Sequence, residues 1–157
     1  MQERAGKLME ESEQRQPDKK SSEDLKLIRV FDFRLIPRYL FEQVKPDGAG
    51  EIEELYGDWG LVMARSPLSL LYAMADEEHK TKGVLWAGID PIRKAITVQT
   101  LSLDKAYQDG KAVPHAIEFL GNIRDRLGLN KIRFMATRPK AFERFGCKKS
   151  DQILMEA

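Results

Sequence analysis

The spacing of apolar residues in the first third of the chain predicts one strand followed by two helices. Apolar residues dominate positions 25–31, which are therefore expected to form a buried first strand. Apolar positions recur at helical spacing over 33–44, where Asp32 can cap the helix or Pro37 can occupy its first turn. A second short helix is expected over 51–56, after a loop rich in glycine.

Three strand-like runs occupy the middle of the chain, over 69–75, 83–89 and 95–103. Polar turns separate them, and one of these turns contains the dipeptide Asp90-Pro91. Short strands at close, regular spacing are typical of an antiparallel meander. The sequence therefore predicts that the three runs pair in order.

The last third of the chain alternates between helical and strand-like patterns. Apolar residues from Val113 to Leu127 fall on one face of a helix, which Gly128 is expected to end. A strand over 131–137, a short helix over 139–146 and a last strand over 152–156 are expected after it. The whole order predicts an α+β (mixed α/β) fold, with a central mixed sheet of about six strands and helices on both faces.

The run 95–103 changes the phase of its alternation part of the way along. Ile96 and Val98 alternate with small or polar neighbours, whereas Leu101 and Leu103 continue the apolar pattern one position out of step. A slip by one residue is what a β-bulge produces, so we expect a bulge near Gln99 to Leu101. The alternative is a strand buried on both faces, where the phase has no meaning.

Half of the first 24 residues are charged, and few of them are apolar. Such a segment buries too little apolar surface to offset the entropy of ordering it. We therefore expect residues 1–24 to be a charged tail that is disordered or ordered by a protein partner. The folded domain is expected over residues 25–157.

The composition excludes several classes of protein. With 26 basic and 25 acidic residues the net charge is +1, which makes nucleic acid or an anionic membrane an unexpected partner. No apolar run approaches the roughly 20 residues that span a bilayer. A single cysteine and no secretory signal favour a reduced, cytoplasmic location. Residues 105–157 carry 11 basic and 6 acidic side chains, which fits either a phosphate-bearing ligand or ordinary surface scatter.

The segment Gly110 to His115 joins a polar loop to the longest predicted helix. Small residues let backbone N–H groups approach a ligand, and a helix N-terminus carries partial positive charge. Together they suit a pyrophosphate, to which Lys111 would add a full charge. The alternative is an ordinary helix start.

Two stretches resemble the GNAT superfamily, the N-acyltransferases that use acetyl-coenzyme A. Residues 110–120 are similar to the family's glycine-rich loop and following helix, and residues 141–147 are similar to its late helix. The resemblance spans about residues 25–156. It implies a sheet splayed between its fourth and fifth strands, with the cofactor's pantetheine arm in the gap, and it agrees with the phase slip near Gln99.

The resemblance also implies a cofactor site and a reaction. Backbone of the fourth strand would line the acyl arm, and backbone of the loop would hold the pyrophosphate of acetyl-CoA. The implied cofactor-binding residues are Leu101, Leu103, Gln108, Gly110, Lys111, Ala112 and Val113. The implied reaction is transfer of an acetyl group from acetyl-CoA to an amine acceptor.

Several positions depart from the family's pattern. Tyr107 stands where Gln or Arg is usual, Pro114 removes one N–H donor, and Phe142 replaces a tyrosine that often donates a proton. The strand 95–103 contains no Asp or Glu to act as a base, so the catalytic residues are unknown. These departures leave an alternative: a catalytically degenerate protein of the same fold that binds a partner or is structural, for example a bacteriophage virion or accessory protein, located in the virion.

The remaining polar candidates each have a structural interpretation that we prefer. His115, His79 and Cys147 are expected to be packing or surface residues, and the acidic group at Glu51, Glu53 and Glu54 a solvated helix face rather than an amine site. Trp59 and Trp86 are expected to pack in or near the core. The basic residues between Arg124 and Lys149 are not interleaved with aromatic ones as in nucleic-acid platforms.

Overall fold

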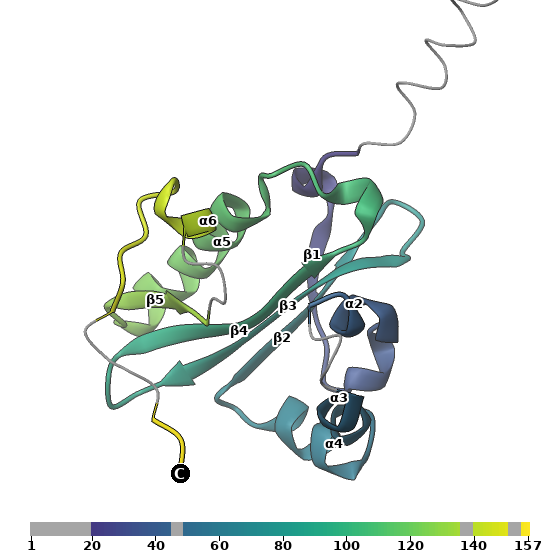
Figure 1. Cartoon of the computed structure of the whole chain (residues 1–157), viewed down its shortest axis with the longest axis horizontal. Helices are drawn as coiled ribbons and strands as arrows, with labels where there is room; N and C mark the ends of the chain where they lie inside the picture. Colours follow the sequence, from purple (N-terminus) through teal and green to yellow (C-terminus); the bar gives the residue numbers. More distant parts are fainter. Residues whose placement is uncertain (1–19, 45–48, 136–139, 151–154) are drawn as a thin grey trace, which may run out of the picture.

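A computed structural model describes residues 20–44, 49–135, 140–150 and 155–157. These residues fold around one sheet whose strands are ordered β1-β2-β3-β4-β5 (Figure 1). The strands span Lys26–Arg29 (β1), Ser69–Ala75 (β2), Thr81–Asp90 (β3), Ala95–Leu103 (β4) and Lys131–Phe134 (β5).

The fold is α+β, as predicted, but among the described residues the sheet has five strands instead of about six. The expected sixth strand, 152–156, lies mostly outside the described residues. Its described part, Met155 and Glu156, is not in a strand, and Met155 is 83% exposed. The apolar pattern of 152–156 therefore predicted a strand that Met155 and Glu156 do not form.

The central meander confirms the sequence prediction. β2 pairs antiparallel with β3, and β3 pairs antiparallel with β4. The bounds of β2 and β4 are those expected from the apolar runs. β1 pairs antiparallel with β2 and lies at one edge of the sheet.

The predicted bulge lies at Gln99. Trp86 pairs with Thr100 whereas Ala87 pairs with Val98, so Gln99 is the extra residue on β4. Gln99 is exposed. Beyond the bulge the alternation is reversed, so that odd-numbered side chains point to the face that even-numbered ones occupy before it. Ile96 and Val98 before the bulge and Leu101 after it consequently pack on the same face of the sheet. The strand is also largely buried on both faces, because Ala95, Thr100 and Ser102 are buried as well, so the bulge and the two-sided burial occur together.

Pairing between β4 and β5 is parallel and short. It joins Ala95–Val98 to Lys131–Phe134 and extends only to the N–H of Met135, which donates to the Val98 carbonyl at 3.1 Å. Among the described residues, 99–103 of β4 have no pairing partner on the β5 side, and residues 136–139, which follow β5, lie outside the described ranges. The described pairing of the two strands thus ends next to the bulge.

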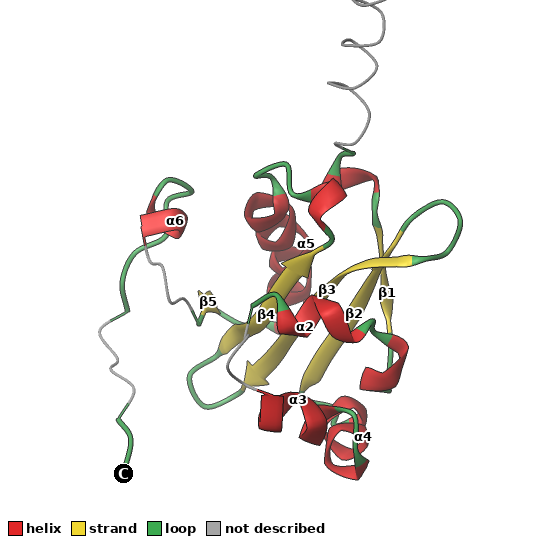
Figure 2. Ribbon diagram, turned by 45° about the vertical axis from the view of Figure 1, so that its right-hand side comes forward, coloured by secondary structure: helices red, strands yellow, loops and turns green. Residues whose placement is uncertain are grey.

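Helices cover both faces of the sheet, as predicted (Figure 2). On one face pack α2 (Arg38–Glu42), α3 (Ala49–Leu55) and α4 (Asp58–Arg65), through buried residues such as Leu40, Ile52 and Ala64. On the other face packs α5 (Ala112–Leu127), with Leu120 fully buried. The short α6 (Lys140–Glu143) overlaps α5 in Figure 1 but stands apart from it in Figure 2.

The segment predicted as one helix over 33–44 forms two short helices, and each begins at one of the predicted start residues. The Asp32 carboxylate accepts the N–H of Arg34 at 2.9 Å and caps the 3-10 helix η2 (Phe33–Leu35). Pro37 occupies the N-cap of α2, and α3 covers the second predicted helix. No pattern had predicted α4.

Two burial expectations were wrong. β1 is not a buried strand: its burial alternates, and Phe31, just beyond its end, is 53% exposed because the strand forms a sheet edge. Trp59 on α4 is 62% exposed. Trp86 does pack, with its ring 5.0 Å from Phe33 in an edge-on arrangement. Within the described part of the chain, no helix is both long and apolar enough to cross a bilayer.

Candidate cofactor-binding site

The part of β4 beyond the bulge presents backbone groups to the side away from β3. The N–H of Asp104 donates to the Lys82 carbonyl of β3 at 2.8 Å. In an antiparallel ladder, hydrogen-bonded residues alternate with residues whose N–H and C=O point to the other side. Leu101 and Leu103, at the alternate positions, therefore direct their backbone groups toward the edge that β5 leaves unpaired.

The carbonyl of Leu103 already has partners in this structure. The side-chain amides of Gln43 on α2 and Gln108 each donate to it at 3.0 Å. Gln108, one of the predicted cofactor-binding residues, thus ties the loop after β4 to the end of that strand. The backbone of Leu101 and the N–H of Leu103 remain directed at the open edge.

The loop between β4 and α5 ends at the start of the longest helix. It contains the 3-10 helix η3 (Lys105–Tyr107), then Gly110 with φ of 76°, a left-handed conformation that favours glycine. Lys111 caps α5 without a side-chain hydrogen bond, and Ala112 and Val113 are the first helical residues. Helix N-termini leave their first N–H groups without intrahelical acceptors, so Ala112 and Val113 fit an anionic group.

A carboxylate lies inside this loop. Asp109 accepts the N–H of Lys111 at 3.0 Å, the N–H of Ser22 at 3.0 Å and the Ser22 hydroxyl at 2.9 Å. Partial burial acts to raise the pKa of Asp109, but the hydrogen bonds from Ser22 and Lys111 outweigh it and lower that pKa below its ordinary value. The Lys111 N–H is therefore not free for a phosphate.

Ser22 itself is fully buried, in the 3-10 helix η1 (Ser22–Asp24). The N–H of Lys20 donates to the Ala106 carbonyl at 2.8 Å, and its ammonium group lies 5.8 Å from the centre of the Tyr107 ring. Residues 20–24, the last part of the expected tail, thus pack on the loop after β4. Most of that tail, residues 1–19, lies outside the described residues.

Arg144 approaches the same loop from the segment after α6. A Cβ built on Gly110 would lie 3.9 Å from an Nη atom of Arg144. The guanidinium also lies 4.6 Å from the centre of the Phe145 ring, which holds it by a cation–π contact. Two cationic side chains, Lys111 and Arg144, therefore flank the glycine.

Phe142 packs its ring 5.0 Å from that of Phe134 at the end of β5. It contributes apolar contact to the β5 side of the open edge and has no group to donate a proton. Cys147 nearby is half-buried and is not in a disulfide. α6 ends at Glu143, earlier than the predicted helix end, and Gly146, with φ of 82°, closes the turn that follows it.

Polar groups gather on the opposite face of β4. The hydroxyl of Tyr39 donates to the carboxylate of Asp104 at 3.0 Å, and Gln43 donates to the hydroxyl of the buried Ser102 at 3.0 Å. Burial, with the hydrogen bond to Asp104, raises the pKa of Tyr39 to about 12. This hydroxyl therefore stays protonated at neutral pH.

The other sequence candidates do not join this arrangement. His115 is half-buried, and its Nε2 has no hydrogen-bond partner. Glu53 pairs with Arg38, so it is not a free acidic site. Among the described residues no group of His, Cys, Asp or Glu is arranged to hold a metal ion.

Three residues of this site went unrecognised in the sequence or lacked a role there. Asp109 directly precedes the first glycine of the loop. A carboxylate at that position departs from a phosphate-binding pattern, so the sequence could have identified this residue. Ser22 carries no local signal, because its contact depends on a residue 87 positions away. In the sequence, Arg144 was recognised only as one of many basic residues, without a role of its own.

Comparisons with solved structures find the same fold in several proteins named as acetyltransferases. A possible acetyltransferase from Clostridium difficile 630 matches with a TM-score of 0.65 and 12% identity, over 85% of this chain and 95% of that one. Glucosamine-6-phosphate N-acetyltransferase from Arabidopsis thaliana matches with a TM-score of 0.61 and 15% identity, over 85% and 97% of the two chains. AAC(6′)-Iy, solved with the bisubstrate analog CoA-S-monomethyl-acetylneamine, matches with a TM-score of 0.59 and 10% identity, over 85% and 96%.

No family model matches the chain, and no curated protein matches it significantly in sequence. The identities to the solved structures are low, so the likeness is one of fold. The chain is a divergent protein of the GNAT fold.

Proposed function

We propose that the protein is an N-acyltransferase that transfers an acetyl group from acetyl-CoA to an amine. One observation carries the proposal: within the described ranges, the half of β4 beyond the Gln99 bulge is unpaired toward β5, and it leads to the glycine loop of α5. An extended thioester arm needs such a free strand edge, and its pyrophosphate needs such a helix start.

The chain's groups have separate roles in this proposal. The backbone of Leu101 and the N–H of Leu103 bind and align the acyl arm. The N–H groups of Gly110, Ala112 and Val113 hold the pyrophosphate. Lys111 and Arg144 supply the positive charge around it. Acetyl-CoA, when bound, supplies the activated thioester carbonyl.

Catalysis would depend on positioning. Holding an amine and a thioester in a reactive geometry lowers the barrier substantially, and N–H donors on the strand polarise the carbonyl. Phe142 cannot act as an acid, and β4 carries no carboxylate. Losing an acid or a base typically lowers the rate by about 10²- to 10⁴-fold. We therefore expect a slow enzyme whose acceptor amine loses its proton to water.

The fold neighbours support an amine acceptor over the non-catalytic alternative. The three structures include a glucosamine-6-phosphate N-acetyltransferase and a protein solved with a CoA bisubstrate analog. Nothing in the comparisons favours a phage structural protein. The cytoplasmic location and a protein partner for the N-terminal tail stay predictions.

Isothermal titration with acetyl-CoA tests the proposal, because one molecule per chain should bind. Ala112→Trp should abolish binding, since the indole would cover the N–H groups at the start of α5. Glu118→Trp, at an exposed position of the same helix, should bind normally. Release of free CoA in the presence of a panel of primary amines then tests transfer. No binding by the wild-type chain, or equal binding by A112W, would contradict the proposal.

A further inference from the structure

A cavity lies at the other end of α5, away from the glycine loop. It has a volume of about 370 Å³ and is lined by residues of β1, β2, β3, the segment before β2 and the last turns of α5. Ile123, which faces it, is eleven residues beyond Ala112, or roughly 16 Å along the helix. The cavity is therefore separate from the proposed cofactor site.

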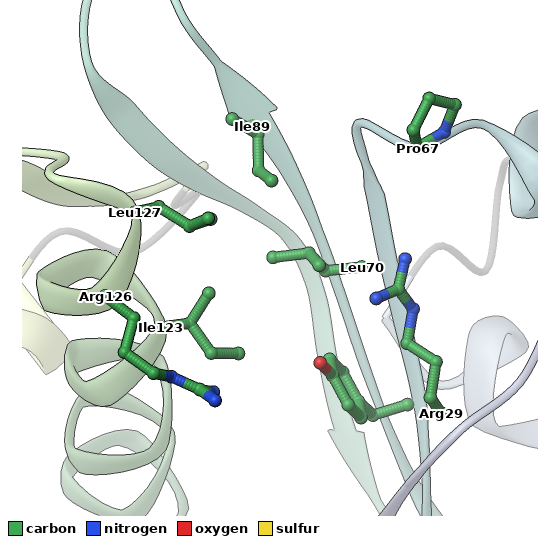
Figure 3. A pocket seen from close by; sticks show the side chains of 8 residues that line it. Arg29, Pro67, Leu70, Ile89, Ile123, Arg126 and Leu127 are labelled. Carbon is green, nitrogen blue, oxygen red and sulfur yellow. The ribbon is translucent and has the colours of Figure 1, made fainter.

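The walls of this cavity are mainly apolar. Figure 3 shows Ile123 and Leu127 of α5 facing Leu70 and Ile89 of the sheet across the space. Leu70 is 4% and Ile123 8% exposed, so they form the floor, whereas Leu127 is 54% exposed and lies at the mouth. Cavities of this size and lining suit small organic molecules.

Two arginines lie on opposite sides of the cavity, Arg29 on the sheet side and Arg126 on the helix side (Figure 3). Within the described ranges, neither forms an ion pair with a carboxylate. A guanidinium stays charged at any ordinary pH, so among the described residues two positive charges, one of them on the exposed Arg126, lie beside an apolar floor without a carboxylate partner.

Arg29 is also held in place. Its Nη2 donates to the Ser69 carbonyl at 2.6 Å, and its guanidinium carbon lies 5.3 Å from the Phe31 ring and 5.9 Å from the Tyr72 ring. Its Nε is buried and has no hydrogen-bond partner among the described residues. Uncharged groups thus hold the Arg29 guanidinium in one position before a ligand binds. The entropy lost on ordering this side chain around an anion is therefore smaller.

We propose that this cavity binds a small molecule consisting of one carboxylate and an apolar chain or ring. The apolar body would lie on Leu70 and Ile123, and the carboxylate would lie between the two arginines. This binding site is independent of the proposed acetyl transfer.

Octanoate is a suitable probe, and 1-octanol is its uncharged counterpart. Calorimetric titration of the full chain should show one octanoate site, with octanol binding at least about tenfold more weakly, because it lacks the charge-assisted hydrogen bonds. Arg126→Gln should weaken octanoate binding by about tenfold on the same reasoning. Arg124→Gln is the matched control, because Arg124 pairs with Asp125 and does not line the cavity.

Two further measurements locate the site. Leu127→Trp fills the mouth from an exposed position and should block octanoate without unfolding the chain. Methyl NMR signals of Leu70, Ile89 and Ile123 should move on octanoate addition, while those of Leu101 and Leu103 stay in place. Equal binding of octanol, unchanged affinity in R126Q, or shifts confined to Leu101 and Leu103 would overturn the proposal.

Discussion

Ser22 and Asp109 lie 87 residues apart in the sequence, and they meet through two hydrogen bonds from the serine to one carboxylate. The same carboxylate accepts the N–H of Lys111, so the N-terminal segment is fastened to the loop that opens α5. A negative charge therefore lies within a loop that we propose to hold a pyrophosphate. Ser22 keeps that charge hydrogen-bonded and fixed.

Replacing Ser22 by Ala should lower the free energy of unfolding by about 1–3 kcal/mol, because a hydrogen bond to a charged group is lost in a fully buried site. It should also weaken acetyl-CoA binding, since the loop is less well ordered. Urea unfolding and calorimetry measure the two effects. Ser21→Ala, which removes only an exposed bond to the Glu23 N–H, should have the smaller effect on stability and none on affinity. Equal effects of the two variants would show that the contact to Asp109 is unimportant.

The contact to Asp109 should also make stability depend on pH. Because folding lowers the pKa of Asp109 below 3.8, its contribution to stability is present above that pH and is lost as the pH falls through the folded value. Asp109→Asn keeps an oxygen acceptor but cannot ionise. The stability advantage of the wild type over D109N should therefore shrink between about pH 5 and about pH 2. Glu118→Gln, which neutralises an exposed side chain elsewhere on α5, is the matched control.

Gly110 and Gly128 provide a matched pair at the two ends of α5. Both have positive φ, 76° and 69°, so alanine at either position should cost about 1–2 kcal/mol of stability. Only Gly110 lies in the proposed pyrophosphate loop, and Gly128 has no atom within 4 Å of an added Cβ. Gly110→Ala should weaken acetyl-CoA binding, and Gly128→Ala should not. Equal affinities of the two variants would remove the loop from the site.

Arg144 should recognise phosphate and not the acyl arm. Arg144→Gln should weaken acetyl-CoA binding by about tenfold, as expected for one charge-assisted contact, and should leave the weaker binding of S-acetylpantetheine unchanged. Lys149→Gln removes a charge from an exposed position of the same segment and is the control. Competition titrations with the two thioesters measure this. A parallel loss for both thioesters would mean that Arg144 acts only through the fold.

The bulge at Gln99 determines which face of the sheet the side chains at the end of β4 point to. Deleting Gln99 would turn the buried Leu103 and the half-buried Leu101 to the opposite face, so the chain should lose about 3 kcal/mol or more of stability. Gln99→Ala keeps the extra residue and removes only an exposed side chain, so it should stay within about 0.5 kcal/mol of the wild type. Thermal unfolding of both variants provides the measurement. Similar stability of the deletion would show that the bulge can be relocated.

The sequence could predict the parts of this molecule that local patterns encode. The parity slip in 95–103 located the bulge, and Gly128 located the end of α5, because each feature follows from backbone geometry within a few residues. The Ser22–Asp109 contact and the approach of Arg144 to Gly110 could not be predicted. Both join segments far apart in the chain, and their positions depend on how η1 and α6 dock. The exposure of Trp59 had the same origin, since it depends on which side of α4 meets the sheet.

The account depends most on the claim that the free edge of β4 and the start of α5 together bind acetyl-CoA. Backbone amide NMR of the wild-type chain tests it directly, with acetyl-CoA added in steps. The amide signals of Leu101, Leu103, Gly110, Ala112 and Val113 should shift together and saturate at one equivalent. Shifts absent from these five, or a spectrum unchanged at saturating acetyl-CoA, would contradict the account.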